Sequence, residues 1–99
     1  MISSIAELRN TLGDAGPPAG LDSALQALWH AAKGDWDKAH ELAQSQDDVT
    51  GAWVHAHLHR IEGDESNAGY WYRRAGKPHA TVPLNEEWET IALALLSRR

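Results

Sequence analysis

The sequence of 99 residues contains no cysteine and no phenylalanine. Without cysteine, the protein has no disulfide bonds, no thiolate nucleophile and no thiolate metal ligand. Without phenylalanine, five tryptophans and two tyrosines must supply the large side chains of the core, with aliphatic residues and alanine between them. Such a mixture of a few large rings and many small residues favours closely packed helices.

Basic residues and long apolar runs are also scarce. Nine Lys and Arg against 14 Asp and Glu give a formal net charge of −5, and the largest basic clusters are the pairs Arg73-Arg74 and Arg98-Arg99. This charge is too negative for a phosphate-binding surface, so we expect no nucleic acid partner. The chain also lacks the ~20 consecutive apolar residues of a membrane span and the features of a secretory signal. We therefore expect no membrane partner and a cytoplasmic protein.

The motifs that identify common enzyme classes are missing. The sequence contains no H-E-x-x-H or G-x-S-x-G motif, no phosphate-binding loop and no dinucleotide fingerprint. We accordingly predict no catalytic residue and no cofactor. A helical scaffold can still assemble a site from scattered side chains, so the sequence leaves enzymatic activity open without favouring it.

Turn and capping residues divide the chain into helices. Gly34 precedes Asp35 and Gly63 precedes Asp64, so in both places a glycine that can end one helix is followed by an aspartate that can begin the next. Turns this short make the joined helices antiparallel neighbours. No segment shows the alternation of apolar and polar residues that a half-buried strand would have. The sequence predicts one all-α domain, 1–99, with hairpins at about 21–46 and 50–76 and capping helices at about 4–12 and 85–97.

Polar residues suggest how the last helix begins. Asn85 can cap it, and Glu86, Glu87 and Glu89 follow at the positive end of the helix dipole. Arg98-Arg99 would lie at the negative end.

The two predicted hairpins repeat one another at an offset of 29 residues. The matched pairs are Ala27 with Ala56, His30 with His59, Gly34 with Gly63, Asp35 with Asp64, and Ala39 with Ala68. Runs 31–39 and 62–75 resemble the turn and second helix of tetratricopeptide or Sel1-like repeats, and the resemblance covers about residues 21–78. It implies a right-handed stack of hairpins with a concave, usually peptide-binding, face. The stretch from His55 to Pro78 also resembles a bacterial family of uncharacterised proteins. This second resemblance says nothing about an activity.

A group of histidines is the most unusual local feature. His55 and His59 are four residues apart and share one face of the predicted helix, a spacing that allows both to bind a divalent metal such as zinc. His30 occupies the matching position in the first hairpin and is a candidate third ligand. The alternative is structural, with each imidazole hydrogen-bonded in the seam between the paired helices.

Trp53, His57 and Arg60 form the opposite stripe of the same predicted helix. The repeat resemblance places them on the concave side, where an aromatic ring, an imidazole and a guanidinium together suit a carboxylate or an acidic peptide. An ordinary helix face packed on a capping helix would explain the same stripe.

Two classes of function remain open from the sequence, beside a purely structural homo-oligomer in which buried Trp88 or Trp29 would form the contact. The first is a non-catalytic module that binds a protein or peptide through Trp53, His57 and Arg60 and that forms a homodimer if its exposed tryptophans associate. The second is a metal- or small-molecule-binding protein, or an enzyme, that uses His55, His59 and His30.

Overall fold

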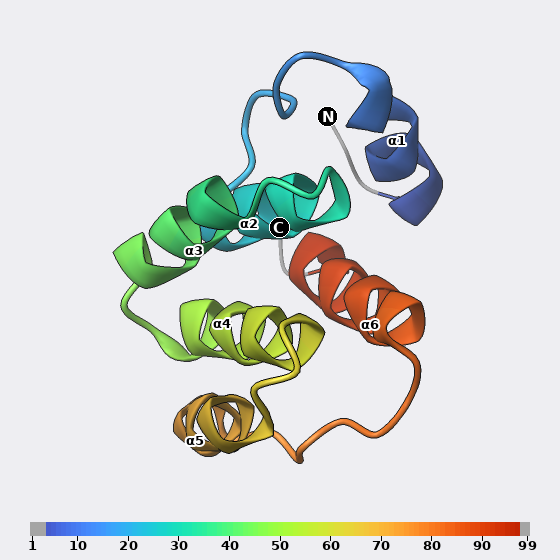
Figure 1. Ribbon diagram of the computed structural model, residues 1–99. Helices are drawn as coiled ribbons and strands as arrows, with labels where there is room; N and C mark the ends of the chain where they lie inside the picture. The colour runs from blue at the N-terminus through green and yellow to red at the C-terminus, as the bar shows by residue number, and fades with distance from the viewer. Residues whose placement is uncertain (1–3, 98–99) are drawn as a thin grey trace.

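The computed structural model describes residues 4–97 and is shown in Figure 1. Its regular elements within that range are all helical, which confirms the predicted all-α class. They are α1 (Ile5–Asn10), a 3-10 turn (Thr11–Gly13), α2 (Ser23–Ala32), α3 (Trp36–Ser45), α4 (Val49–Ile61), α5 (Glu65–Ala75) and α6 (Leu84–Ser97). None of these helices has the length and apolar character needed to cross a lipid bilayer.

Short polar side chains begin α1 to α5. In each case the side-chain oxygen of the capping residue accepts a hydrogen bond from the backbone amide three residues later, and the capping residues are Ser4, Asp22, Asp35, Asp48 and Asp64. Gly34 and Gly63 both have φ of 81°, a left-handed conformation that favours glycine. The turn residues therefore act as the sequence predicts.

Neighbouring helices pack in chain order. α2 lies against α3, α3 against α4, and α4 against α5, while α6 returns to contact α2 and α4. Figure 1 shows α1 next to α2 and α6, and α5 on the far side of α4 from α2. Because α4 contacts α2, α3, α5 and α6, side chains on all of its faces meet other helices.

The main core lies where α2, α4 and α6 meet. Its fully buried side chains include Leu25, Leu28, Leu58 and Ile91. The indole Nε1 of Trp88 on α6 donates a hydrogen bond to the carbonyl oxygen of Leu28 on α2 at 2.8 Å. Burial of each such aliphatic side chain stabilises the fold by roughly 1.5–3 kcal/mol, so this junction holds the last helix in place.

α6 differs in two ways from the expectation for the last helix. It begins at Leu84, so Asn85 lies in the first turn and does not cap the helix. Glu87 is buried, whereas Glu86 beside it is exposed. Glu87 therefore contributes more than a favourable interaction with the helix dipole, and its partners are described below. Arg98 and Arg99 lie outside the described residues.

Candidate metal centre

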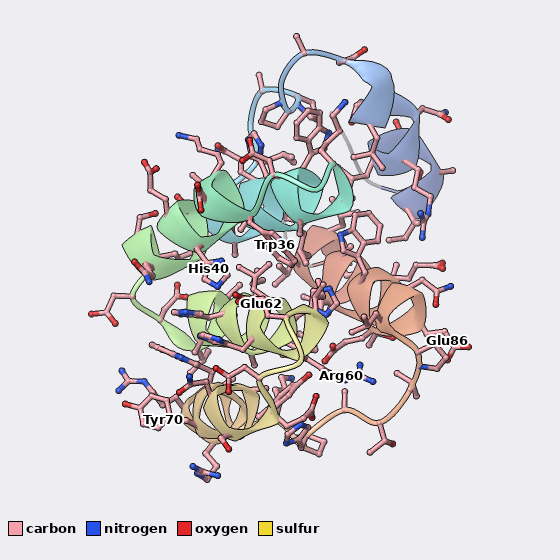
Figure 2. The ribbon with its side chains drawn as sticks, in the orientation of Figure 1. Trp36, His40, Arg60, Glu62, Tyr70 and Glu86 are labelled. Atoms are coloured by element: carbon pink, nitrogen blue, oxygen red, sulfur yellow. The ribbon has the colours of Figure 1, made fainter. Side chains whose placement is uncertain are left out.

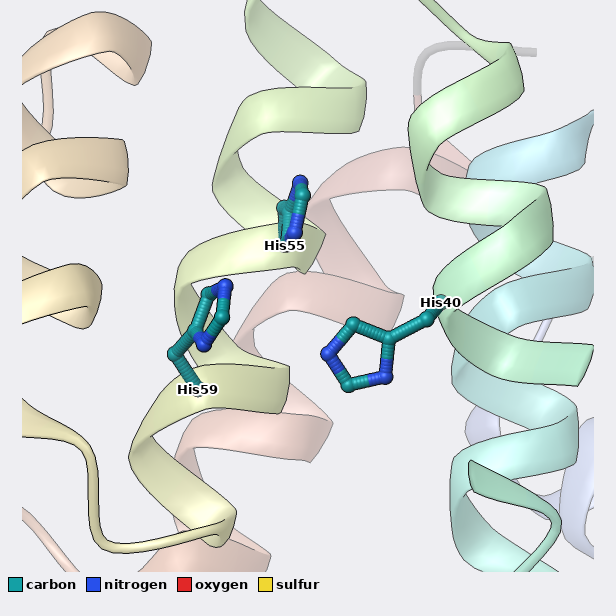
Figure 3. Close-up of side chains that lie close together, drawn as sticks. All are labelled: His40, His55 and His59. Atoms are coloured by element: carbon teal, nitrogen blue, oxygen red, sulfur yellow. The ribbon is translucent and has the colours of Figure 1, made fainter. Parts of the chain in front are cut away.

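Three histidines converge between α3 and α4 (Figure 3). His40 projects from α3, and His55 and His59 project from successive turns of α4. One nitrogen of each ring lies within 4.8 Å of one nitrogen of each of the other two. The rings of His55 and His59 are stacked at 4.8 Å, and His40 meets both rings edge-on.

Local sequence explains why the two helices can bring these rings together. The spacing of four residues puts His55 and His59 on one face of α4. Gly51 in the first turn of α4 lies against the end of α3, and a Cβ there would collide with the backbone carbonyl of Gln46. The absence of a side chain at residue 51 therefore permits the close approach that brings His40 to α4.

His40 has an acceptor at each of its ring nitrogens. Nδ1 lies 3.2 Å from the carbonyl oxygen of Trp36, and Nε2 lies 3.0 Å from Oε1 of Glu62. These residues are labelled in Figure 2. The Trp36 carbonyl can accept a proton from Nδ1, and Nε2, which lies beside Glu62, is the ring nitrogen that faces the cluster. Backbone carbonyls orient metal-binding histidines in this way.

His59 carries an unsatisfied polar atom. Its Nδ1 is buried and has no hydrogen-bond partner among the described residues. The nearest carboxylate oxygens, those of Glu62 and Asp64, lie 3.7 and 4.0 Å away, beyond hydrogen-bonding distance. A buried nitrogen without a partner is costly, and a bound cation near Glu62 would satisfy it.

His55 is held between rings. Its imidazole stacks on the indole of Trp71 with centroids 4.0 Å apart, and the guanidinium of Arg74 lies 5.2 Å from that indole. Burial, followed by the nearby charges of His59 and His40, lowers the pKa of His55 from 6.5 to about 4. The ring is consequently neutral at pH 7, which is the form that binds a metal ion.

A cleft reaches the cluster from the side of the α3–α4 turn. It has a volume of about 400 Å³, and its lining includes Ala52, His55, Trp71, Arg74 and Asp48. Since His55 contributes to its wall, a small ion or molecule in the cleft can reach the His55 ring.

The predicted ligand His30 does not belong to this cluster. His30 lies on α2, with its Nδ1 3.6 Å from Asp35 and its ring edge-on to Trp29 at 5.0 Å. The structure supplies His40 in its place. Sequence reasoning could have found His40, because it lies on the stripe that starts with Trp36 and continues to Ala43, close to the predicted buried face of α3.

His57 and Arg60, two of the three residues predicted to form a concave peptide-binding face, both contact Glu87. Nδ1 of His57 lies 2.7 Å from Oε1 of Glu87, and Nη1 of Arg60 lies 3.1 Å from the same oxygen. The Tyr72 hydroxyl donates to the other carboxylate oxygen. Trp53 is half-buried, and the Lys77 ammonium lies 4.3 Å from the centre of its ring. The three residues therefore do not form one exposed surface.

Comparison of the chain with protein-family models, curated proteins and solved structures finds no match.

Proposed function

We propose that this protein binds a divalent transition-metal ion, with zinc as the first candidate, through His40, His55 and His59. The observation that carries the proposal is the convergence of one nitrogen from each of three imidazoles to within 4.8 Å. Imidazole nitrogen is a preferred ligand of zinc, and three histidines form a complete protein ligand set in several zinc sites. Any activity that uses this site would then require the bound ion.

The rings need a small movement to bind zinc. At a zinc–nitrogen distance near 2.05 Å, two ligands of a tetrahedral ion are about 3.4 Å apart. Because the three ligand nitrogens lie within 4.8 Å of one another, no pair has to approach by more than about 1.4 Å. The side chains of His40 and His59 are 22% and 17% exposed, which leaves them room to change rotamer. His55, stacked on Trp71, serves as the fixed ligand.

Glu62 supplies negative charge beside the ion. Its carboxylate oxygen lies 3.0 Å from Nε2 of His40 and 3.7 Å from Nδ1 of His59. A metal ion bound to Nε2 of His40 would occupy the place of a proton between that nitrogen and the Glu62 carboxylate. Glu62 then acts either as a fourth ligand or as a hydrogen-bond partner that orients a ligand.

Metal titration of the untagged, chelator-treated protein tests the proposal. We expect zinc to bind with one ion per chain in calorimetry, and cobalt to give the visible absorption of a low-symmetry site. His40→Gln and His59→Gln should each abolish binding while circular dichroism stays unchanged. Glu62→Gln should weaken zinc binding by about tenfold, because it removes the charge and keeps the shape.

His30→Gln is the matched control. His30 is a partly exposed histidine at the corresponding position of the first hairpin and lies outside the cluster. This variant should bind zinc as the wild type does. If zinc fails to bind, or if His30→Gln loses binding to the same extent as His59→Gln, the cluster is a structural seam and the proposal is wrong.

The repeat resemblance supports a proposal about the scaffold. We propose that hairpins α2–α3 and α4–α5 stack as tetratricopeptide-like units, with α1 and α6 as caps. Binding of a protein or peptide by Trp53, His57 and Arg60 stays a prediction. A cleft of about 380 Å³ lined in part by Trp53 and Lys77 favours a contact centred on the tryptophan. Loss of acidic-peptide binding in a folded Trp53→Ala variant would support this contact.

A further inference from the structure

A separate cavity lies where α1, α2, α4 and α6 meet. Its volume is about 220 Å³. At the roughly 30 Å³ that a water molecule occupies in the liquid, this volume holds a molecule of about seven non-hydrogen atoms. Three apolar side chains, those of Ile61, Leu84 and Trp88, form much of the wall, and the polar side chains in the lining are those of Arg9, His57 and Asn85.

His57 is the buried polar group of this cavity. It is 1% exposed, and its Nδ1 is held 2.7 Å from Oε1 of Glu87. Tyr72 and Arg60 also donate to this carboxylate, so the position of the imidazole is set from several helices. With Nδ1 engaged by Glu87, Nε2 is the nitrogen that His57 can offer to a ligand. A ring positioned in this way needs no reorganisation on binding.

Arg9 is the cation in the cavity lining, and the acidic side chains near it, Glu89 and Glu87, lie outside that lining. None of the described residues that line it is acidic. Arg9 reaches it from α1, with its guanidinium 4.8 Å from the centre of the Trp88 ring and Nη2 3.4 Å from Glu89. A carboxylate can accept from the guanidinium and from the Asn85 amide. Nε2 of His57 is a further polar contact for the carboxyl group.

We propose that this cavity is a binding site for a short-chain monocarboxylate. Its hydrocarbon chain packs against Leu84, Ile61 and Trp88, and its carboxyl group meets Arg9 and His57. The proposal uses none of the residues of the histidine cluster. It therefore stands or fails independently of metal binding.

Nuclear magnetic resonance titration with butyrate tests the site, with n-butanol and n-butylamine as probes of matched size. Butyrate should give saturable shifts of the Trp88 indole and Asn85 amide signals, and the two other probes should bind at least tenfold more weakly. Arg9→Gln should weaken butyrate binding by about tenfold. Glu89→Gln, which frees Arg9 from its ion pair, should preserve or strengthen it.

A steric variant identifies the cavity itself. Ala32→Leu places a larger side chain at an exposed position of the lining and should block butyrate without disturbing the core. His57 is left intact because its replacement would disturb Glu87. Equal binding of butyrate and butanol, unchanged binding by Arg9→Gln or Ala32→Leu, or no saturable shift would each overturn the proposal.

Discussion

Nδ1 of His57 on α4 lies 2.7 Å from Oε1 of Glu87 on α6, and the two residues are 1% and 3% exposed. Arg60 and Tyr72 donate to the same carboxylate, and Arg60 also donates to the carbonyl oxygen of Val82 in the preceding loop. One acidic side chain thereby joins α4, α5 and α6. A buried carboxylate is tolerated only with such partners, because the transfer of an unpaired charge out of water is costly.

Replacement of Glu87 should destabilise the protein strongly. Glu87→Gln keeps the shape of the side chain but removes the charge that balances Arg60. It also places the NH2 group of an amide against side chains that donate hydrogen bonds to the native carboxylate. We expect the free energy of unfolding at pH 7 to fall by about 2–4 kcal/mol in urea titrations. Glu86→Gln, at the exposed neighbouring position, should change it by less than about 0.5 kcal/mol. Equal effects of the two variants would contradict a stabilising role for Glu87.

The contribution of Glu87 to the stability of the fold should decrease at acid pH. Burial alone would raise the pKa of Glu87, but hydrogen bonds from His57 and Tyr72, the charge of His57 and a hydrogen bond from Arg60 together lower it below its ordinary value of 4.5. The unfolded chain therefore takes up this proton first, and stability is lost as the pH falls from 4.5 through the pKa of the folded state.

Glu87→Gln isolates this contribution. The difference in unfolding free energy between wild type and variant should be constant above pH 5.5, at least about one unit above the ordinary pKa, and should narrow below pH 4.5 as Glu87 becomes neutral. Chemical denaturation of both proteins at a series of pH values measures this difference in the constant range and in the acid range. A difference that stays constant down to the acid transition would show that the charge of Glu87 is not what stabilises the fold.

Gly51 should tolerate no side chain. The Cβ of an alanine there would overlap the carbonyl oxygen of Gln46, and backbone cannot move aside as a flexible side chain can. We expect Gly51→Ala to lower the free energy of unfolding by about 1–3 kcal/mol. Because α4 would be pushed away from α3, zinc affinity should fall as well.

Gly69→Ala provides the comparison within another helix. A Cβ at residue 69 would come no closer than 3.5 Å to other atoms, those of the Arg73 and His79 side chains. Since alanine favours helix by about 1 kcal/mol over glycine, this variant should be as stable as the wild type or more so. Urea titrations that rank the two variants in the opposite order would contradict the close approach of α3 and α4.

Short-range patterns in the sequence predicted the helices and two histidines of the candidate site, His55 and His59. Asp35 and Asp64 begin helices because their side chains bond to amides only three residues away, a contact that needs no other part of the fold. His55 and His59 share a face of α4 for a similar reason, since the helical repeat alone brings residues four apart together. Stacking of the hairpins and a peptide-binding face stay predictions.

Tertiary packing decided which helix faces which. His40 joins His55 and His59 because α3 and α4 meet at a glycine without a side chain, and His30 pairs with Asp35 on its own hairpin. Glu87 is buried because α6 folds back onto α4. Its contact with His57 joins two residues that are 30 positions apart in the sequence. Capping and helical spacing act within about four residues and can be read along the chain. The rotation and approach of packed helices depend on all of their contacting side chains at once, so only the folded chain determines them.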